Sequence, residues 1–334
     1  MSDTAVSATT VLGSGPVALA HALFAARQGP VVLAGRSVPP RPGVESVPAA
    51  VLTLLLELGI TPAELDVDRL DRGRLVAWEQ TEPEVRSSPA CAQLDRAALL
   101  TALWRRIRCC PQIRVVGRLR ARLSDAVTGR LVDATGRRAV TAHDHLRPRQ
   151  PWVAASCTVP RRTFDPTMRL AAGAGGYAYR LGSASWLTVG WAGTSVPPRD
   201  ADALRRRIFD AGAGWLVEQV PLEGMPTTCR VASMSIPVRG PGPIVALGDA
   251  ALARDALASQ GGSIGLSDAR LAAEPATSSE DITQRAAEGR ARHLQFLTGV
   301  LDSCRHRDTP AWSEYRQWVA HQCVAGVRSA AGAR

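Results

Sequence analysis

Residues 10–36, "TVLGSGPVALAHALFAARQGPVVLAGR", decide the fold. A short apolar strand over 11–12 leads into a glycine turn. Apolar residues at helical spacing follow over about 16–28, and a second apolar strand covers 31–34. The order strand, glycine turn, helix, strand is typical of a dinucleotide-binding unit. An ordinary tight turn in an α/β protein is the alternative interpretation.

Three small residues of this unit match a GxGxxA turn. Gly13 permits the tight turn, Gly15 lets the backbone approach a pyrophosphate, and Ala18 allows the helix to pack closely on the strands. The free N–H groups of the helix N-terminus would bind the phosphates.

The second strand normally ends in a carboxylate that binds the adenosine ribose, but here Gly35 and Arg36 follow it. Arg36 could face a phosphate or stack on adenine, and we expect weak or transient cofactor binding.

The composition excludes several classes of function. The chain has 334 residues and a formal net charge of +10, and it contains arginine but no lysine. Because the arginines are scattered and aromatic residues make up only 4%, we expect no nucleic-acid partner. The seven cysteines show no metal-type CxxC spacing and predict reduced thiols. The N-terminus is unlike a signal peptide and no apolar run is long enough to span a membrane, so we expect a cytoplasmic protein without a membrane partner.

Further along the chain, several polar residues are candidates for a site. The segment "RLVDATGRR" over 130–138 reads as a short strand and a second glycine turn, at Gly136. Asp95 is an expected helix N-cap, and Arg96 beside it either faces a cofactor or makes a surface ion pair. The histidines of "HDH" over 143–145 could line a site or bind a metal, but no third ligand follows at a readable spacing, so we interpret the segment as a surface turn and expect no metal site.

The pattern becomes β-rich over 151–238 and predicts antiparallel strands, before a buried strand returns at "GPIVALGDAA". We predict an α/β fold in which a Rossmann-type domain is interrupted by a β-sheet substrate domain and followed by a helical tail capped by Ser279. The predicted division gives a discontinuous nucleotide-binding domain, 8–75, 92–150 and 240–275; a substrate domain, 76–91 and 151–239; a C-terminal helical segment, 276–324; and a disordered end, 325–334.

Taken together, these segments resemble the flavoprotein monooxygenase superfamily with a p-hydroxybenzoate-hydroxylase-type fold. Within it the chain is most similar to the tryptophan-halogenase-like branch. That branch includes FAD-dependent enzymes that hydroxylate tryptophan side chains during maturation of quinone-cofactor amine dehydrogenases and oxidases. The resemblance spans roughly 10–275 and rests on five segments in order: GxGxxA (13–18), "GVESVPAAVLTLLLELGI" (43–60), "LDRAALLTAL" (94–103), "DATGRR" (133–138) and "GDAALARDALASQGGSIGL" (248–266).

The resemblance implies that FAD is the cofactor. In such flavoproteins the acid after the strand, here Asp249, hydrogen-bonds the ribityl chain, and the turn at 259–263 points N–H groups at the isoalloxazine ring. Glu45 and Ser46 sit in a turn that lies near the flavin edge in relatives. The expected cofactor-binding residues are Gly13, Gly15, Ala18, Arg36, Glu45, Ser46, Arg96, Gly136, Gly248, Asp249, Ser259, Gln260, Gly261 and Gly262. Aromatic residues that could wall a substrate pocket, although a core role is more common for such side chains, are Trp78, Tyr177, Tyr179 and Trp191.

The implied activity is that of a monooxygenase acting through a flavin C4a-hydroperoxide on an indole- or tryptophan-type substrate, either a small molecule or carried by a peptide or protein. NAD(P)H would supply electrons directly or through a separate flavin reductase. Halogenases of this type relay hypohalous acid through an active-site lysine, which this chain lacks. Arg254 and Ala256 depart from the aromatic residue and the proline that are usual in the family. A binding or scaffold protein without catalysis is therefore an alternative, as is a reductase or dehydrogenase. No catalytic base is identified.

Overall fold

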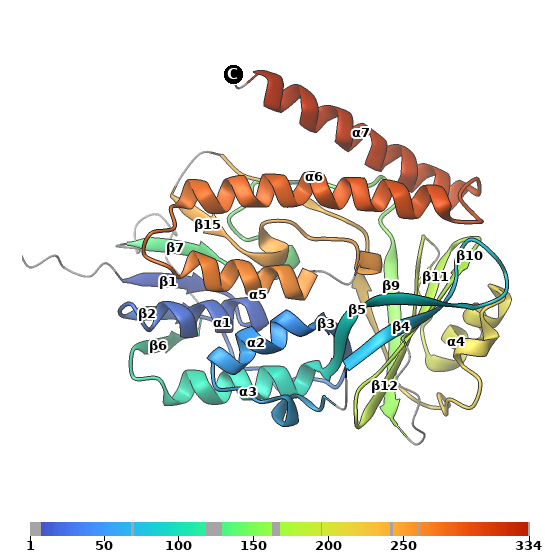
Figure 1. Cartoon of the computed structure of the whole chain (residues 1–334), viewed down its shortest axis with the longest axis horizontal. Coiled ribbons are helices and arrows are strands. Elements are labelled where there is room, and N and C mark those ends of the chain that lie inside the picture. The colour runs from blue at the N-terminus through green and yellow to red at the C-terminus, as the bar shows by residue number, and fades with distance from the viewer. Residues whose placement is uncertain are drawn as a thin grey trace, which may run out of the picture.

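A five-stranded parallel sheet carries the glycine turn predicted at the start of the chain (Figure 1). The computed structural model describes residues 8–67, 70–117, 129–161, 168–194, 196–240, 243–258 and 261–332. The strands of this sheet pair in parallel in the order β15-β7-β1-β2-β6. Their bounds are β1 Thr9–Leu12, β2 Val31–Ala34, β6 Ile113–Val116, β7 Arg130–Asp133 and β15 Ile244–Ala246. The helices packed around it are α1 Pro16–Ala25, α2 Ala49–Glu57, α3 Arg96–Cys109 and α5 Gly261–Ala272.

Helix α1 crosses from β1 to β2 as the sequence predicts, so the strand–turn–helix–strand unit is confirmed. The helix ends at Ala25, earlier than the expected end near 28, because the next residues close a turn in which Gln28 N–H donates to the carbonyl oxygen of Ala25. The carboxyl ends of β1, β2 and β7 therefore meet at one edge of the sheet, beside the N-terminus of α1.

An eight-stranded mixed sheet forms the other half of the described chain, in the order β13-β9-β12-β11-β10-β4-β5-β3. Its bounds are β3 Val44–Pro48, β4 Leu70–Ala77, β5 Glu84–Asp95, β9 Val153–Pro160, β10 Met168–Gly173, β11 Gly176–Gly182, β12 Trp186–Gly193 and β13 Thr227–Val231. The pairings place β3 and β4 in this sheet, although the sequence-based division assigned most of both to the nucleotide-binding domain. The division into functional domains stays a prediction.

Short elements complete the connections. Strands β8 Asp144–Leu146 and β14 Ile236–Val238 form a two-stranded ladder. The segment expected as a surface turn at 143–145 is therefore partly a strand, because β14 supplies it with a hydrogen-bonding partner. Helix α4 spans Ala201–Asp210, and the 3₁₀ helices cover Pro62–Leu65, Gly136–Arg138, Gly214–Leu216, Gly248–Ala250 and Ala256–Ala258.

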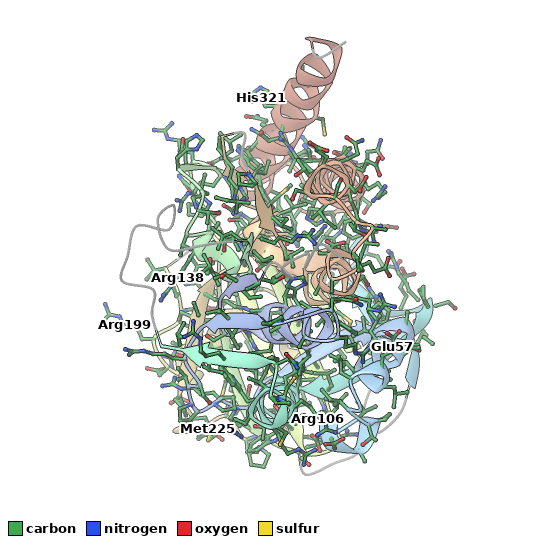
Figure 2. All side chains as sticks on the ribbon, turned by 90° about the vertical axis from the view of Figure 1, so that its left-hand side faces the viewer. Glu57, Arg106, Arg138, Arg199, Met225 and His321 are labelled. Atoms are coloured by element: carbon green, nitrogen blue, oxygen red, sulfur yellow. The ribbon has the colours of Figure 1, made fainter. Side chains whose placement is uncertain are left out.

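Two long helices end the chain. Helix α6, Ser279–Ser303, lies along both sheets, and α7, Pro310–Gly332, begins beside the eight-stranded sheet and then rises away from α6 (Figure 1). Figure 2 shows His321 on this rising part of α7. The N-cap of α6 is Ser278 and not Ser279, because the Ser278 hydroxyl and the Asp281 carboxylate form a reciprocal capping box. Helix α7 continues to Gly332 and so includes most of 325–334, which the sequence predicts to be disordered.

The buried apolar side chains of the described residues form three clusters. One lies between the parallel sheet and its helices, and the other two lie on opposite faces of the eight-stranded sheet. On one of these faces Leu204 and Ile208 of α4 are fully buried, which stabilises the fold by about 1.5–3 kcal/mol for each side chain. The opposite face packs against α6 and α7. Within the described residues no helix is both long enough and apolar enough to cross a bilayer.

Candidate functional site

The first glycine turn is shaped by close backbone contacts. Gly13 has a φ of +130°, and a Cβ atom built on it would lie 2.4 Å from the carbonyl oxygen of Ala134. Only glycine fits this position without a backbone shift. A Cβ on Gly15, in contrast, would meet nothing within 4 Å, so the space above this residue is open. Ala18 is fully buried against the turn, as its position in GxGxxA predicts.

Two helix N-termini converge at this turn. No side chain caps α1, so the first N–H groups of that helix are free to bind an anion. A Cβ built on Gly265 of α5 would lie 2.7 Å from Val17 Cγ2, and one turn further along His21 Nδ1 lies 2.9 Å from the Ala269 carbonyl oxygen. The two helices therefore run side by side in the same direction. Their positive dipole ends add at one place, which favours a negatively charged ligand.

The end of β2 lacks room for the missing acid. A Cβ atom at Gly35 would lie 2.2 Å from the carbonyl oxygen of Gly13. Any side chain at this position would require the turn to move. Arg36 follows it, exposed to solvent and near Gly117 at the end of β6. The edge of the sheet thus offers a cation where a ribose-binding carboxylate is usual.

Asp249 lies directly beside the start of α5. Gly248 has a φ of +58°, which turns the chain so that a Cβ built on Gly261 would lie 3.1 Å from Asp249 Oδ1. Asp249 Oδ2 lies 3.5 Å from Nε of Arg137. Burial raises the pKa of the Asp249 carboxyl above its ordinary value. The guanidinium groups of Arg137, Arg254 and Arg230 oppose this shift.

Arg137 connects three distant segments, and sequence reasoning missed it. Besides the ion pair with Asp249, its Nη1 donates to the Ser233 carbonyl oxygen at 2.6 Å and its Nη2 to the Arg254 carbonyl oxygen at 2.5 Å. The only sequence signal was its place directly after Gly136 in "DATGRR". Gly136, with a φ of +68°, turns the chain so that the arginine can reach all three partners.

Glu45 reaches the same place from the second sheet. It lies on β3, not in the expected turn, because β3 pairs in antiparallel register with β5. Glu45 Oε1 lies 3.4 Å from Arg96 Nη1, and a Cβ on Gly262 would lie 3.6 Å from Glu45 Oε2. Ser46 is next to it in the strand and is paired with Gln93. The ion-pair reading of Arg96 is confirmed, and this pair with Glu45 lies beside the start of α5; that Arg96 faces a cofactor stays a prediction.

The N-cap role of Asp95 is confirmed. Its carboxylate accepts hydrogen bonds from the N–H groups of Ala97 and Ala98, at 3.1 and 3.2 Å. It also accepts one from Gly43 N–H at 3.1 Å. One side chain therefore starts α3, which holds Arg96, and fixes the entry into β3, which holds Glu45.

The aromatic candidates separate onto two faces of the eight-stranded sheet. Trp78, Tyr177 and Tyr179 belong to the cluster beneath α6 and α7. Trp191 belongs to the cluster on the other face, with α4, because it pairs with Ala178 and side chains alternate along β11. All four are buried, so Trp191 does not share a wall with the other three.

Arg230 of edge strand β13 is a further cation at this site that the sequence did not reveal. Its pKa is raised above the ordinary value, chiefly by the Tyr179 phenol and then by Glu45 and Tyr177. Arg230 also lowers the pKa of Asp249. Ser259 and Gln260, which were expected to bind the cofactor, lie outside the described residues.

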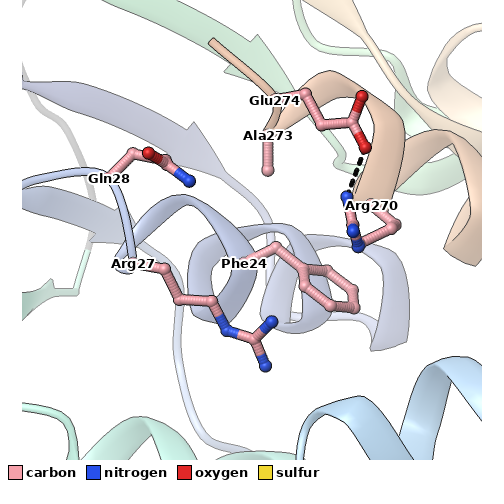
Figure 3. Close-up of a pocket in the computed structure, with 6 residues that line it drawn as sticks. All are labelled: Phe24, Arg27, Gln28, Arg270, Ala273 and Glu274. Carbon is pink, nitrogen blue, oxygen red and sulfur yellow. Dashed lines mark hydrogen bonds and ion pairs between the residues drawn. The ribbon is translucent and has the colours of Figure 1, made fainter.

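A surface pocket lies away from these residues, at the C-terminal end of α1 (Figure 3). Helix α1 has ten residues and is about 15 Å long, so this pocket is at the opposite end from the glycine turn. Arg27 and Arg270 lie over the Phe24 ring, at 5.3 and 5.6 Å from its centroid. Arg270 is paired with the carboxylates of Glu57 and Glu274, which leaves this pocket a weak anion site.

Comparison with solved structures identifies the fold. The chain aligns with QhpG, a peptidyl tryptophan dihydroxylase essential for tryptophylquinone cofactor biogenesis, at 22% identity over 93% of this chain and 78% of that chain, with a TM-score of 0.71. It aligns with CndH, a myxobacterial chondrochloren halogenase and a variant of FAD-dependent halogenases, at 20% identity over 98% and 90%, with a TM-score of 0.66. A tryptophan halogenase from Shewanella frigidimarina aligns at 12% identity over 94% and 80%, with a TM-score of 0.73.

No protein-family model and no curated protein matches the sequence. The structural likeness nevertheless covers 93–98% of this chain. The chain therefore has the fold of the flavin-dependent halogenases and of the peptidyl tryptophan dihydroxylase, as its sequence resemblance predicts.

Proposed function

We propose that this protein is an FAD-dependent monooxygenase that hydroxylates an aromatic substrate of the indole type, carried by a peptide. The observation that carries the proposal is the meeting of two helix N-termini with two carboxylates. Asp249 follows β15 of the parallel sheet and Glu45 lies on β3 of the eight-stranded sheet, and both border the first two residues of α5. This arrangement supplies N–H donors and polar side chains to one elongated ligand that is anionic at its centre.

The residues fit FAD along most of its length. The open space over Gly15 and the free N-terminus of α1 would hold the diphosphate, and Asp249 would accept from the hydroxyl groups of the ribityl chain. The N–H groups at the start of α5 would face the ring. Bound FAD would supply the activated oxygen for transfer to the substrate. Gly35 gives no carboxylate to the adenosine ribose, which supports weak or transient binding.

Hydroxylation is favoured over halogenation by composition. The chain contains no lysine, so a lysine that relays hypohalous acid is absent from the whole sequence. The neighbour QhpG is named as acting on peptidyl tryptophan, which supports a peptide-borne indole as the substrate class. Electrons would come from NAD(P)H, directly or through a separate flavin reductase.

A second candidate function is binding without catalysis. The contact between Gly35 and Gly13 favours it, because a fold that no longer needs FAD can lose the ribose-binding acid.

The location we propose is the cytoplasm, and it is supported by the cysteines. All seven are free thiols, including the adjacent pair Cys109 and Cys110.

Titration of the purified protein with FAD, followed by flavin fluorescence, tests the proposal. We expect saturable binding with a Kd on the order of micromolar, about −8 kcal/mol. Asp249→Ala should weaken it about tenfold or more, as expected when a hydrogen bond of roughly 1.5 kcal/mol to a charged group is lost. Glu274→Gln, an exposed change in the distant pocket, is the matched control and should bind like the wild type. Absence of binding by the wild type would leave the non-catalytic alternative.

A further inference from the structure

A continuous series of aromatic rings connects the candidate site to α7. Consecutive ring centroids are 4.6–6.4 Å apart, which is the range of direct ring contact. The chain has only three tyrosines, and all three belong to the series. Its members are Tyr179, Tyr177, Trp78, Trp152, Trp312, Tyr315 and Trp318.

The shortest path through the series has four steps. Tyr179 lies 6.4 Å from Tyr177, and Tyr177 lies 5.9 Å from Trp152. Trp152 lies 5.2 Å from Tyr315, and Tyr315 lies 6.0 Å from Trp318. The three inner rings are no more than 2% exposed, whereas Trp318 is partly exposed on α7. The path therefore runs from the residue that contacts Arg230 through the core to the surface.

The three tyrosines differ in what can accept their phenolic proton. Tyr315 Oη donates to Asp255 Oδ2 at 2.6 Å. Within the described residues Tyr177 Oη has no hydrogen-bond partner. Tyr179 adjoins the Arg230 guanidinium, a group that has donors but no acceptor. Tyr315 is thus the tyrosine placed beside a base.

Packing alone does not explain the buried carboxylate. Asp255 is 2% exposed, and an ionised group in such a place costs free energy unless it is well paired. Its Oδ1 accepts from Leu257 N–H at 2.7 Å, and its Oδ2 accepts from Tyr315. Burial raises the pKa of Asp255 to about 6. The carboxylate is therefore a stronger proton acceptor than an ordinary aspartate, yet it is ionised at neutral pH.

We propose that this series of rings carries one-electron oxidation out of the candidate site and that the Tyr315–Asp255 pair traps it. A hydroperoxyl radical, formed where oxygen is activated, takes one electron from Tyr179 and one proton from solvent to become hydrogen peroxide. Each oxidised ring then regains its electron from the next ring along the path. In the last step Tyr315 gives one electron to oxidised Trp152 and its phenolic proton to Asp255 Oδ2. The products are a neutral tyrosyl radical, a protonated Asp255 and an unchanged Trp152.

The formation of the hydroperoxyl radical rests on the proposed function. The capture of the oxidation by the Tyr315–Asp255 pair does not depend on that function. Phenol and indole are the most readily oxidised of the common aromatic side chains, and a phenol is oxidised far more easily when a base takes its proton in the same step. The pathway would protect the residues around Asp249 when oxygen is activated and no substrate is present. A soluble thiol reductant would return the electron to Tyr315 through Trp318, which is partly exposed on α7.

The trap is tested without flavin. Photogenerated tris(2,2′-bipyridine)ruthenium(III) oxidises the full-length protein at its surface, and the sample is frozen rapidly and examined by electron paramagnetic resonance. We expect a neutral tyrosyl radical in the wild type and its loss in Tyr315→Phe, although Tyr177 and Tyr179 are still present. Asp255→Asn should also lose the signal, because an amide does not accept the proton. Trp104→Phe, a buried tryptophan of a different cluster, is the control and should keep it.

An undiminished tyrosyl signal in Tyr315→Phe would overturn the proposal, as would a wild type that forms no tyrosyl radical. Near-ultraviolet circular dichroism shows whether each variant is folded. If Asp255→Asn does not fold, the result for Tyr315→Phe decides by itself. This variant removes only one hydroxyl group from a packed ring, so we expect it to stay folded. A second arm illuminates the FAD-loaded protein with blue light and compares Tyr179→Phe with the wild type, and we expect the variant to form the Tyr315 radical more slowly. Failure to bind FAD would defeat the proposed function and leave the ruthenium result unaffected.

Discussion

Gly35 and Gly13 are in contact through the backbone alone: a Cβ atom on Gly35 would lie 2.2 Å from the Gly13 carbonyl oxygen. The residue that usually provides the ribose-binding acid therefore serves here to let two turns approach each other. Restoring the acid by Gly35→Glu should not strengthen FAD binding. We expect it to destabilise the fold by about 1–3 kcal/mol, the usual cost of overpacking. Urea unfolding and FAD titration of the variant measure both effects. Tighter FAD binding with unchanged stability would show that the turn can move to admit the side chain.

Removal of Arg137 should affect both cofactor binding and stability. Its guanidinium satisfies the carbonyl oxygens of Ser233 and Arg254 and pairs with Asp249. Arg137→Gln leaves two partly buried acceptors without their donor, for which we expect a loss of about 1–3 kcal/mol in unfolding free energy. FAD affinity should fall as well. Arg138→Gln is the matched control, because Arg138 is exposed to solvent (Figure 2). Equal behaviour of the two variants would contradict the role given to Arg137.

Acid should weaken the contact between α1 and α5. Burial lowers the pKa of His21 to about 4, from an ordinary value of 6.5. The unfolded chain therefore binds this proton more readily than the folded one. The contribution of His21 to stability is fully present above pH 6.5 and is lost as the pH falls toward 4. From pH 7 to pH 5 the His21 contribution to the free energy of unfolding falls by about 2 kcal/mol. The variant His21→Asn keeps a donor near the Ala269 carbonyl oxygen and should lack this part of the pH dependence.

The comparison of wild type with His21→Asn at both pH values isolates this residue. His293, whose pKa burial also lowers to about 4, acts in the same direction and is unchanged in the variant. Asp255 acts in the opposite direction between pH 4 and pH 6, because burial raises its pKa to about 6. Chemical denaturation at pH 7 and pH 5 gives the four free energies needed. A variant that loses as much stability in acid as the wild type would show that His21 does not contribute.

Trp191 should matter for stability and not for cofactor binding. It lies on the face of the eight-stranded sheet that packs against α4, opposite Tyr177 and Tyr179. Trp191→Phe removes part of a buried ring, for which we expect a loss of about 1–2 kcal/mol. The Kd for FAD of the folded variant should equal that of the wild type. A large change in Kd would place Trp191 near the site after all.

The features that the sequence predicts well are local. The strand–turn–helix–strand unit of 10–36 depends on residues that are neighbours in the chain, and so does the cap formed by Asp95. Gly13 and Ala18 could be assigned roles because a glycine turn has the same steric demands in any protein. The closeness of Asp249 to the start of α5 follows from their short separation along the chain.

The features that the sequence missed depend on distant partners. Arg137 binds backbone carbonyl oxygens that are 96 and 117 residues away. Every residue has such a carbonyl group, so the sequence does not show which of them will accept a hydrogen bond. Glu45 was expected in a turn, because only the pairing of β3 with β5 makes it part of a strand. The side of the sheet on which Trp191 lies depends on the register between β11 and β12. The sequence does not distinguish Arg230 from the other arginines of the chain, because arginine stands at all forty positions that hold lysine or arginine.

The strand order of the parallel sheet has a consequence for synthesis on the ribosome. Strand β7 is made early, but the strand that pairs with its outer edge, β15, begins 111 residues after β7 ends. At the usual rate of translation that interval lasts roughly 5–20 seconds. Throughout it a nascent chain would carry an unpaired edge on its half-built sheet, which is a template for aggregation. We expect this protein to depend on chaperones while it is being made, even though its finished sheet has β15 in place.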